Sequence, residues 1–129
     1  MPQELRTDLN GLRVRLPGTP PIYLIDLGKR RHIPNPQIYD RLFTTWDGVI
    51  DDIDIDEIQL GDPIPETAML FACSDSPKVF LLDGIAPKQV KRHVFDPATM
   101  QRYKFRWPQP WSSPLNSIGW PDGPPIKNP

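Results

Sequence analysis

The sequence lacks the features that mark several broad classes of protein. Cys73 is the only cysteine, so no disulfide can form within the chain. No run of about 18 apolar residues occurs, and the first residues do not combine a basic start with an apolar stretch as a secretory signal does. We therefore expect no membrane insertion, and either a cytoplasmic location or export by a route that needs no such signal.

Charge of one sign is not in excess either. The 129 residues include 15 lysines and arginines and 16 aspartates and glutamates, which gives a formal net charge of -1. A balanced chain has no overall field that attracts a polyanion. We therefore expect no binding to nucleic acid.

Catalytic signatures are missing as well. The sequence has no Gly-x-Ser-x-Gly elbow, P-loop, dinucleotide glycine fingerprint or His-Glu-x-x-His pair. We expect a protein that is not an enzyme and binds no cofactor. The enzymatic alternative is a hydrolase or transferase that uses Cys73 or His93, whereas lone cysteines more often serve as small buried apolar residues.

What the sequence does have is proline. It contains 18 prolines and only eight glycines. Proline breaks helices and cannot donate to a sheet ladder, so this composition favours short strands, turns and extended segments. The composition predicts an α+β fold that is mainly β.

An internal repeat gives the strongest signal. Apolar, basic and turn-forming positions recur in one register: Ile22–Asp26 matches Val79–Asp83, Arg31–Ile33 matches Arg92–Val94, Trp46 matches Trp107, and Gly61–Ile64 matches Gly123–Ile126. Such self-similarity predicts two tandem copies, residues 11–66 and 67–127, related by a pseudo-two-fold within one compact domain. Residues 1–10 form an N-terminal arm and residues 121–129 a proline-rich tail, and we expect both to order only against a partner.

Each copy is predicted to be a three-stranded meander followed by a short helix. Alternating apolar residues over Leu12–Leu16 predict the first strand and the apolar run Ile22–Asp26 predicts the central one. A tight turn at residues 27–29 then leads into the third, over Arg30–Ile33. Asn35 and Asp96 each precede a proline, which is typical of a helix N-terminus. Trp46 and Trp107 are expected to close the core beneath the helices.

The first copy resembles a repeat of bacterial, often surface-linked, proteins of poorly defined function. The resemblance is carried by Tyr23–Pro36, with its YLID, KRRH and IPNP segments, and by Gly61–Pro65. It is looser in the second copy, where Phe95 replaces the first proline. The resemblance implies an adhesion or recognition module and supplies no catalytic residues.

Two residue patterns raise the possibility of a metal site. His32 and His93 could face each other across the pseudo-two-fold, but a zinc site needs three or four ligands. We expect them to be structural, for example by bonding strand backbone near Asp26 or Asp83. The acidic stretch Asp51–Glu57 fails the calcium-loop pattern, so we interpret it as a strand with one solvated face followed by a short helical turn.

The basic clusters at residues 29–31 and 88–92 could bind phosphate, but cross-strand pairs with Asp26, Asp83 or the acidic stretch are the simpler interpretation. Tryptophans in the C-terminal third could instead stack on sugar rings, anchor a protein partner or fill core space. The candidate binding residues are Tyr103, Trp107, Trp111, Trp120 and Arg92.

The sequence therefore predicts a recognition or assembly module for a glycan or a protein, of open oligomeric state. A small toxin or effector subunit is the main alternative.

Overall fold

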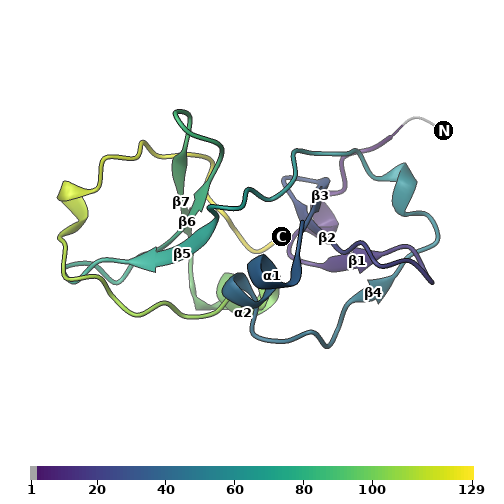
Figure 1. The fold of residues 1–129 in the computed structure, drawn as a ribbon, viewed down its shortest axis with the longest axis horizontal. Coiled ribbons are helices and arrows are strands. Elements are labelled where there is room, and N and C mark those ends of the chain that lie inside the picture. Colours follow the sequence, from purple (N-terminus) through teal and green to yellow (C-terminus); the bar gives the residue numbers. More distant parts are fainter. Residues whose placement is uncertain (1–2) are drawn as a thin grey trace.

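The computed structural model describes residues 3–129, which form two small β-sheets on either side of a pair of short helices (Figure 1). The strands are β1 (Arg13–Arg15), β2 (Tyr23–Asp26), β3 (Lys29–His32), β4 (Ile50–Asp51), β5 (Met69–Ala72), β6 (Val79–Asp83) and β7 (Val90–Val94). The helices are α1 (Pro36–Leu42) and α2 (Pro97–Tyr103), with single 3-10 turns η1 (Thr7–Leu9), η2 (Ile55–Glu57) and η3 (Leu115–Ser117). The α+β, mainly β class predicted from composition is confirmed.

The two sheets have the same internal order for their three main strands. One sheet has the order β3-β2-β1-β4 and the other β5-β6-β7, and every pair is antiparallel except β1 with β4. In both sheets the residue opposite the histidine is aromatic and the residue opposite the arginine is leucine: Tyr23 with His32, Phe80 with His93, Leu24 with Arg31, and Leu81 with Arg92.

A segment that begins with glycine pairs with one edge strand of each sheet, β3 in the first sheet and β7 in the second. Gly61 donates its N–H to the Arg30 carbonyl at 3.0 Å, and Gly123 donates to the Lys91 carbonyl at 2.9 Å. A Cβ atom at Gly123 would lie 2.5 Å from the Val90 side chain, so the close pairing requires glycine. These contacts explain why the Gly-x-Pro-Ile segment occurs twice.

The two termini do not behave as free arms. Glu4 forms a parallel bridge with Ile58, and Arg6 donates its N–H to the Gly28 carbonyl at 2.8 Å. At the other end, Ile126 forms a parallel bridge with Val94 and is 2% exposed. The expectation that residues 1–10 and 121–129 order only against a partner is therefore wrong for the described residues, because their backbone is paired within the chain.

Both helices begin where the sequence predicts. The side chain of Asn35 accepts the N–H of Ile38 at 2.9 Å, and that of Asp96 accepts the N–H of Thr99 at 2.8 Å. In each helix the proline after the cap occupies the first turn, where its missing N–H leaves no hydrogen bond unmade. The caps fix the position of the loops that precede them.

One hydrophobic core is shared by both halves and lies between the sheets and the helices (Figure 1). It includes Leu24, Ile33, Ile38, Tyr39, Leu42, Phe43 and Ile64 from the first half, and Val79, Leu81, Val94, Met100, Tyr103, Phe105 and Ile126 from the second. Phe43 and Phe105 form an antiparallel bridge with rings stacked 5.6 Å apart. The halves are thus joined directly through the segments that follow their helices.

The opposite face of each sheet is covered by a chain segment of its own half. In the first half Ile55 and Ile58 pack on β1 and β2, while Ile53 is 79% exposed. The predicted strand through Ile53 is therefore wrong beyond β4, because the chain enters η2 to bury Ile55. In the second half Trp111 and Trp120 take the covering role, against Phe71 and neighbouring apolar residues of β5 and β6.

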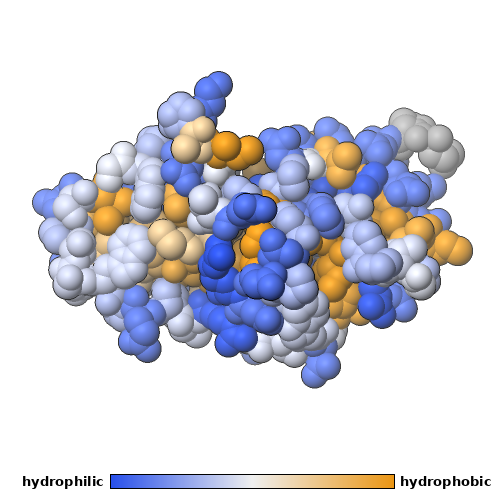
Figure 2. Space-filling view, viewed as in Figure 1, coloured by the Kyte–Doolittle hydropathy of each residue, from blue (hydrophilic) through white to orange (hydrophobic). Residues whose placement is uncertain are grey.

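The outer surface is mixed in character. Figure 2 shows hydrophilic residues gathered over the middle of one face, with apolar residues scattered to both sides. Trp46 is 48% exposed and Trp107 is 61% exposed, so the prediction that they close the core is wrong. Among residues 3–129 no helix has the length and apolar character needed to cross a bilayer.

Candidate functional site: a buried ion network and two matched pockets

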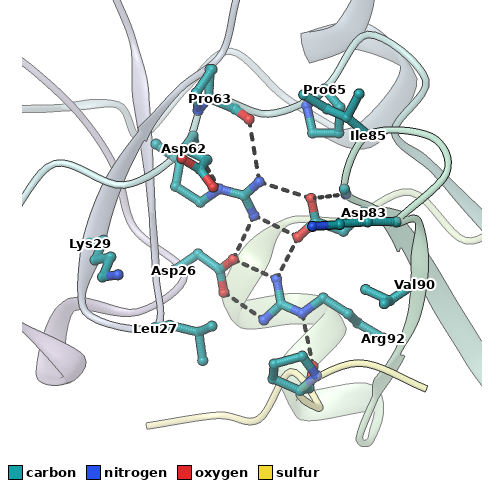
Figure 3. Close-up of a pocket in the computed structure, with 14 residues that line it drawn as sticks. Asp26, Leu27, Lys29, Asp62, Pro63, Pro65, Asp83, Ile85, Val90 and Arg92 are labelled. Atoms are coloured by element: carbon teal, nitrogen blue, oxygen red, sulfur yellow. Dashed lines mark hydrogen bonds and ion pairs between the residues drawn. The ribbon is translucent and has the colours of Figure 1, made fainter. Parts of the chain in front are cut away.

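Two aspartates and two arginines form a closed network where the sheets approach each other (Figure 3). Alternation along β2 and β6 places Asp26 and Asp83 on the same face as the core leucines, and the facing strands present Arg31 and Arg92. All four residues are at most 8% exposed. Of the cross-strand pairs predicted for the two basic clusters, those of Arg31 with Asp26 and of Arg92 with Asp83 are confirmed, whereas within residues 3–129 Lys29 and Lys88 form no ion pair.

The strongest bonds of the network run between the two halves of the chain. Arg31 binds both carboxylate oxygens of Asp83, at 2.7 and 2.8 Å, and Arg92 binds both oxygens of Asp26, at 2.5 and 2.9 Å. Each arginine also reaches the aspartate of its own half, at 2.9 Å for Arg31 and 3.1 Å for Arg92. Such two-point contacts fix the relative orientation of the charged groups.

A further N–H group of each guanidinium donates to a backbone carbonyl. The Nε atom of Arg31 donates to the Asp62 carbonyl at 2.8 Å, and that of Arg92 donates to the Pro124 carbonyl at 2.8 Å. A cavity of about 530 Å³ opens above the network, with Lys29 and Lys88 on its wall. Carboxylates and carbonyls already accept the hydrogen bonds of the buried arginines. The two lysines on the wall are therefore the main groups of this cavity that could bind an incoming anion.

The electrostatics of the network favour the charged forms. Desolvation opposes ionisation of Asp83, but hydrogen bonding and the positive charge of Arg31 outweigh it and lower the pKa of Asp83 to about 2. The carboxylates in turn raise the pKa of Arg31 and Arg92 despite desolvation. The network is therefore a structural clasp that holds the two halves together at neutral pH.

This shift predicts an acid-dependent loss of stability. Because the pKa of Asp83 is lower in the folded protein than the ordinary 3.8, the carboxylate stabilises the fold above pH 4 and loses its effect as pH falls towards 2. We expect the free energy of unfolding to fall by on the order of 2 kcal/mol over this range. Urea titrations at several acidic pH values measure the slope, and the same series on Asp83→Asn should show a shallower one; equal slopes would contradict the assignment.

Two apolar pockets lie at matching places in the two halves. The Trp46 pocket has a volume of about 290 Å³ and the Trp107 pocket about 520 Å³. The first is lined by Pro20, Pro21, Ile22, His32, Ile33, Pro34, Asn35, Pro36, Tyr39 and Trp46. The second is lined by Pro77, Lys78, Val79, His93, Val94, Phe95, Asp96, Pro97, Met100 and Trp107. Taken in chain order, the ten lining positions of one pocket correspond one to one with those of the other.

The wall of the Trp46 pocket is held from behind by a buried arginine. Arg13, 4% exposed, donates to the hydroxyl of Tyr39 and to the Thr45 carbonyl. The Tyr39 ring stacks on Trp46 with centroids 3.9 Å apart, and the Trp46 indole N–H donates to Asp40 at 2.7 Å. The indole is thus fixed with one face against the protein and its outer edge in solvent.

The Trp107 pocket is larger and less constrained. Met100 occupies the place of Tyr39, and among residues 3–129 no hydrogen bond engages the Trp107 indole N–H. Phe95, 54% exposed, also lines this pocket and adds a second exposed aromatic surface. Methionine and an unbonded indole can adjust to different ligand shapes, which a stacked tyrosine cannot do as readily.

Of the five predicted binding residues, only Trp107 lines an open pocket as an exposed side chain. Tyr103 is 1% exposed and stacks on Phe105 in the shared core, and Arg92 belongs to the ion network. Trp111 and Trp120 pack on Phe71. The sequence analysis missed Phe95 and the prolines that line both pockets, although the recurrence of Pro36 as Pro97, four residues after the matched histidines, was a usable signal.

Comparison of the chain with family models, curated proteins and solved structures gives no match. The chemistry of the pockets and of the network is therefore the basis for inferring a function.

The histidines and the cysteine have packing roles. His32 lies against the Tyr23 ring and His93 against the Phe80 ring, both with centroids 5.6 Å apart, so the expected contacts near Asp26 and Asp83 are wrong. Cys73 is 2% exposed, and desolvation, with a smaller effect of Asp75, raises the pKa of its thiol. No group of three metal-ligating side chains occurs within the described range 3–129.

Proposed function

We propose that this protein is a non-enzymatic recognition module that binds a partner protein through the Trp46 and Trp107 pockets. The observation that carries the proposal is the one-to-one correspondence of their ten lining positions. Concave apolar surfaces with a partly exposed tryptophan are the usual anchor sites of protein interfaces. Matched pockets also allow two segments of one partner to be held at once, which raises the overall affinity.

The correspondence is best explained if the chain is a tandem duplication with a pseudo-two-fold axis through the ion network. This proposal is supported by the matched strand registers, by the reciprocal bonds of Arg31 to Asp83 and Arg92 to Asp26, and by the equivalent closing segments. The resemblance to bacterial tandem repeat modules fits the same origin and stays a prediction.

The lining of the pockets favours a protein over a glycan. A sugar presents several hydroxyl groups that need polar partners when buried. In the Trp46 pocket the Asn35 side-chain oxygen already accepts the N–H of Ile38, and the Tyr39 hydroxyl donates to the Thr45 carbonyl at 2.6 Å. His32 and the Asn35 amide N–H groups remain as polar contacts, whereas most of the lining consists of prolines and aromatic or aliphatic side chains, which suit apolar or proline side chains of an extended peptide.

The environments of Cys73 and His93 support the non-enzymatic part of the proposal. Cys73 is buried and its pKa is raised, which disfavours the thiolate that nucleophilic chemistry requires. His93 contacts Phe80 rather than a nucleophile. These residues do not assemble the base and nucleophile pair that a hydrolase needs.

Peptide selection on the full chain tests the function. We expect random peptides displayed on phage to yield binders with an apolar anchor, and Trp107→Ala or Trp46→Ala to weaken the selected peptides about tenfold or more, since buried tryptophan anchors contribute at least 1.4 kcal/mol. Trp107 is exposed, so its substitution should leave the fold intact. Binders that are insensitive to both substitutions, or binding confined to a glycan array, would overturn the proposal.

A further inference from the structure

The two pockets share their positions but differ in charge. No lysine, arginine, aspartate or glutamate lines the Trp46 pocket, whereas Lys78 and Asp96 line the Trp107 pocket. Lys78 stands where the first pocket has Pro21. A second cation, Lys127, does not line the pocket itself but lies over the ring of its lining residue Phe95, at 5.1 Å from the ring centroid. The chain thus contains one uncharged pocket and one with a charged rim.

The anions near the Trp107 pocket are already engaged. Asp96 caps α2, where it accepts the N–H and the hydroxyl of Thr99 at 2.8 Å each, and these bonds lower its pKa. Asp122 forms an ion pair with Lys91 at 2.8 Å. Within residues 3–129 neither Lys78 nor Lys127 forms an ion pair. The two lysines therefore form no direct ion pair, and Asp122, whose pKa is lowered mainly by its hydrogen bond to Lys91 and to a smaller extent by the charge of Lys78, is already bound to Lys91.

We propose that the Trp107 pocket binds an acidic segment of the partner protein, with one apolar side chain inserted into the pocket against Trp107 and Phe95, and flanking carboxylates on Lys78 and Lys127. The inference rests on the proposed function and specifies the ligand of one of its two pockets. Charge complementarity supports it, because unpaired lysines beside an apolar cavity attract a carboxylate and repel a basic peptide. Met100 on the pocket floor accommodates apolar side chains of different shape.

Nuclear magnetic resonance on the full-length 15N-labelled protein provides the test. The chain has four tryptophans, so it gives four indole N–H signals, which single Trp→Phe variants assign. Three blocked peptides serve as probes at up to millimolar concentration: Asp-Glu-Leu-Asp-Glu, Ser-Ser-Leu-Ser-Ser and Lys-Lys-Leu-Lys-Lys. We expect the acidic peptide to shift the Trp107 signal with an affinity about five- to tenfold higher than the basic peptide at low salt, and the preference to shrink as salt rises.

Two variants separate charge recognition from apolar contact. Lys78→Gln with Lys127→Gln should remove the preference for the acidic peptide, whereas Lys104→Gln, at the residue after the C-terminal end of α2 and outside the pocket lining, should not. The Trp46 signal should respond to the three peptides without a preference for charge. If the acidic and basic peptides shift Trp107 equally, the charge inference is wrong and the proposed function stands. If no peptide shifts either indole signal, both are wrong.

Discussion

Replacing Arg92 with methionine is expected to lower the free energy of unfolding by about 3–5 kcal/mol, because it leaves two buried carboxylates to share the single positive charge of Arg31. Arg92 is 2% exposed and supplies both bonds of the two-point contact with Asp26, so the methionine variant leaves only Arg31 at 2.9 Å. Urea denaturation followed by circular dichroism measures the loss. A change below about 1 kcal/mol would mean that the network does not hold the halves together.

An exposed ion pair provides the matched control. Arg15 binds Asp51 at 2.8 Å, but the two side chains are 44% and 52% exposed. Solvent screens such a pair, so Arg15→Met should change the free energy of unfolding by less than about 1 kcal/mol. The contrast between two arginine to methionine changes then isolates burial as the cause.

A quadruple variant separates the cost of an unpaired charge from the value of the network itself. Replacing Asp26 and Asp83 with leucine together with Arg31 and Arg92 with methionine removes every charge of the cluster. Because buried ion pairs often stabilise no more than apolar residues of similar size, we expect this variant to recover most of the stability lost in Arg92→Met. A further loss would instead indicate that the clasp orients the halves in a way that apolar packing cannot replace.

Local structure in this chain was largely predictable because it depends on short-range chemistry. Asn35 and Asp96 cap their helices as the following prolines indicate. The strands β2 and β6 lie where the apolar runs place them, and β3 and β7 coincide with the matched basic segments that follow. Period-two alternation along β2 also places Asp26 on the same face of the sheet as Leu24, which locates a carboxylate in the shared core.

The errors concern residues whose environment is set by distant segments. Trp46 and Trp107 follow the helices in sequence, but the core beneath is already filled by Phe43 and Phe105, which pair across the halves and leave both indoles outside. The proline-rich tail reads as disordered, yet Ile126 completes the core beside β7. Composition alone does not reveal such pairing. The pairing depends on which edge strand still has unpaired backbone groups once the rest of the sheet has formed.

Trp111→Ala is the second large effect that we expect, and it decides between the packing and binding interpretations of the C-terminal tryptophans. The Trp111 ring stacks on Phe71 with centroids 4.8 Å apart and planes 10° apart, and its backbone N–H donates to the Ala72 carbonyl at 2.9 Å. Removing it uncovers one face of β5 and β6, so the free energy of unfolding should fall by about 3 kcal/mol. Thermal or urea denaturation provides the measurement.

Trp107→Ala is the control, since it deletes the same side chain at a site that is 61% exposed. Its effect on unfolding should stay within about 0.5 kcal/mol, as for other surface substitutions. The two variants should therefore have opposite effects. Trp111→Ala should lose stability but, under conditions where it is still folded, keep peptide binding. Trp107→Ala should keep its stability and lose peptide binding. If Trp111→Ala instead folds normally and loses binding, the covering segment after α2 is the interaction surface, and the assignment of the ligand to the Trp107 pocket is wrong.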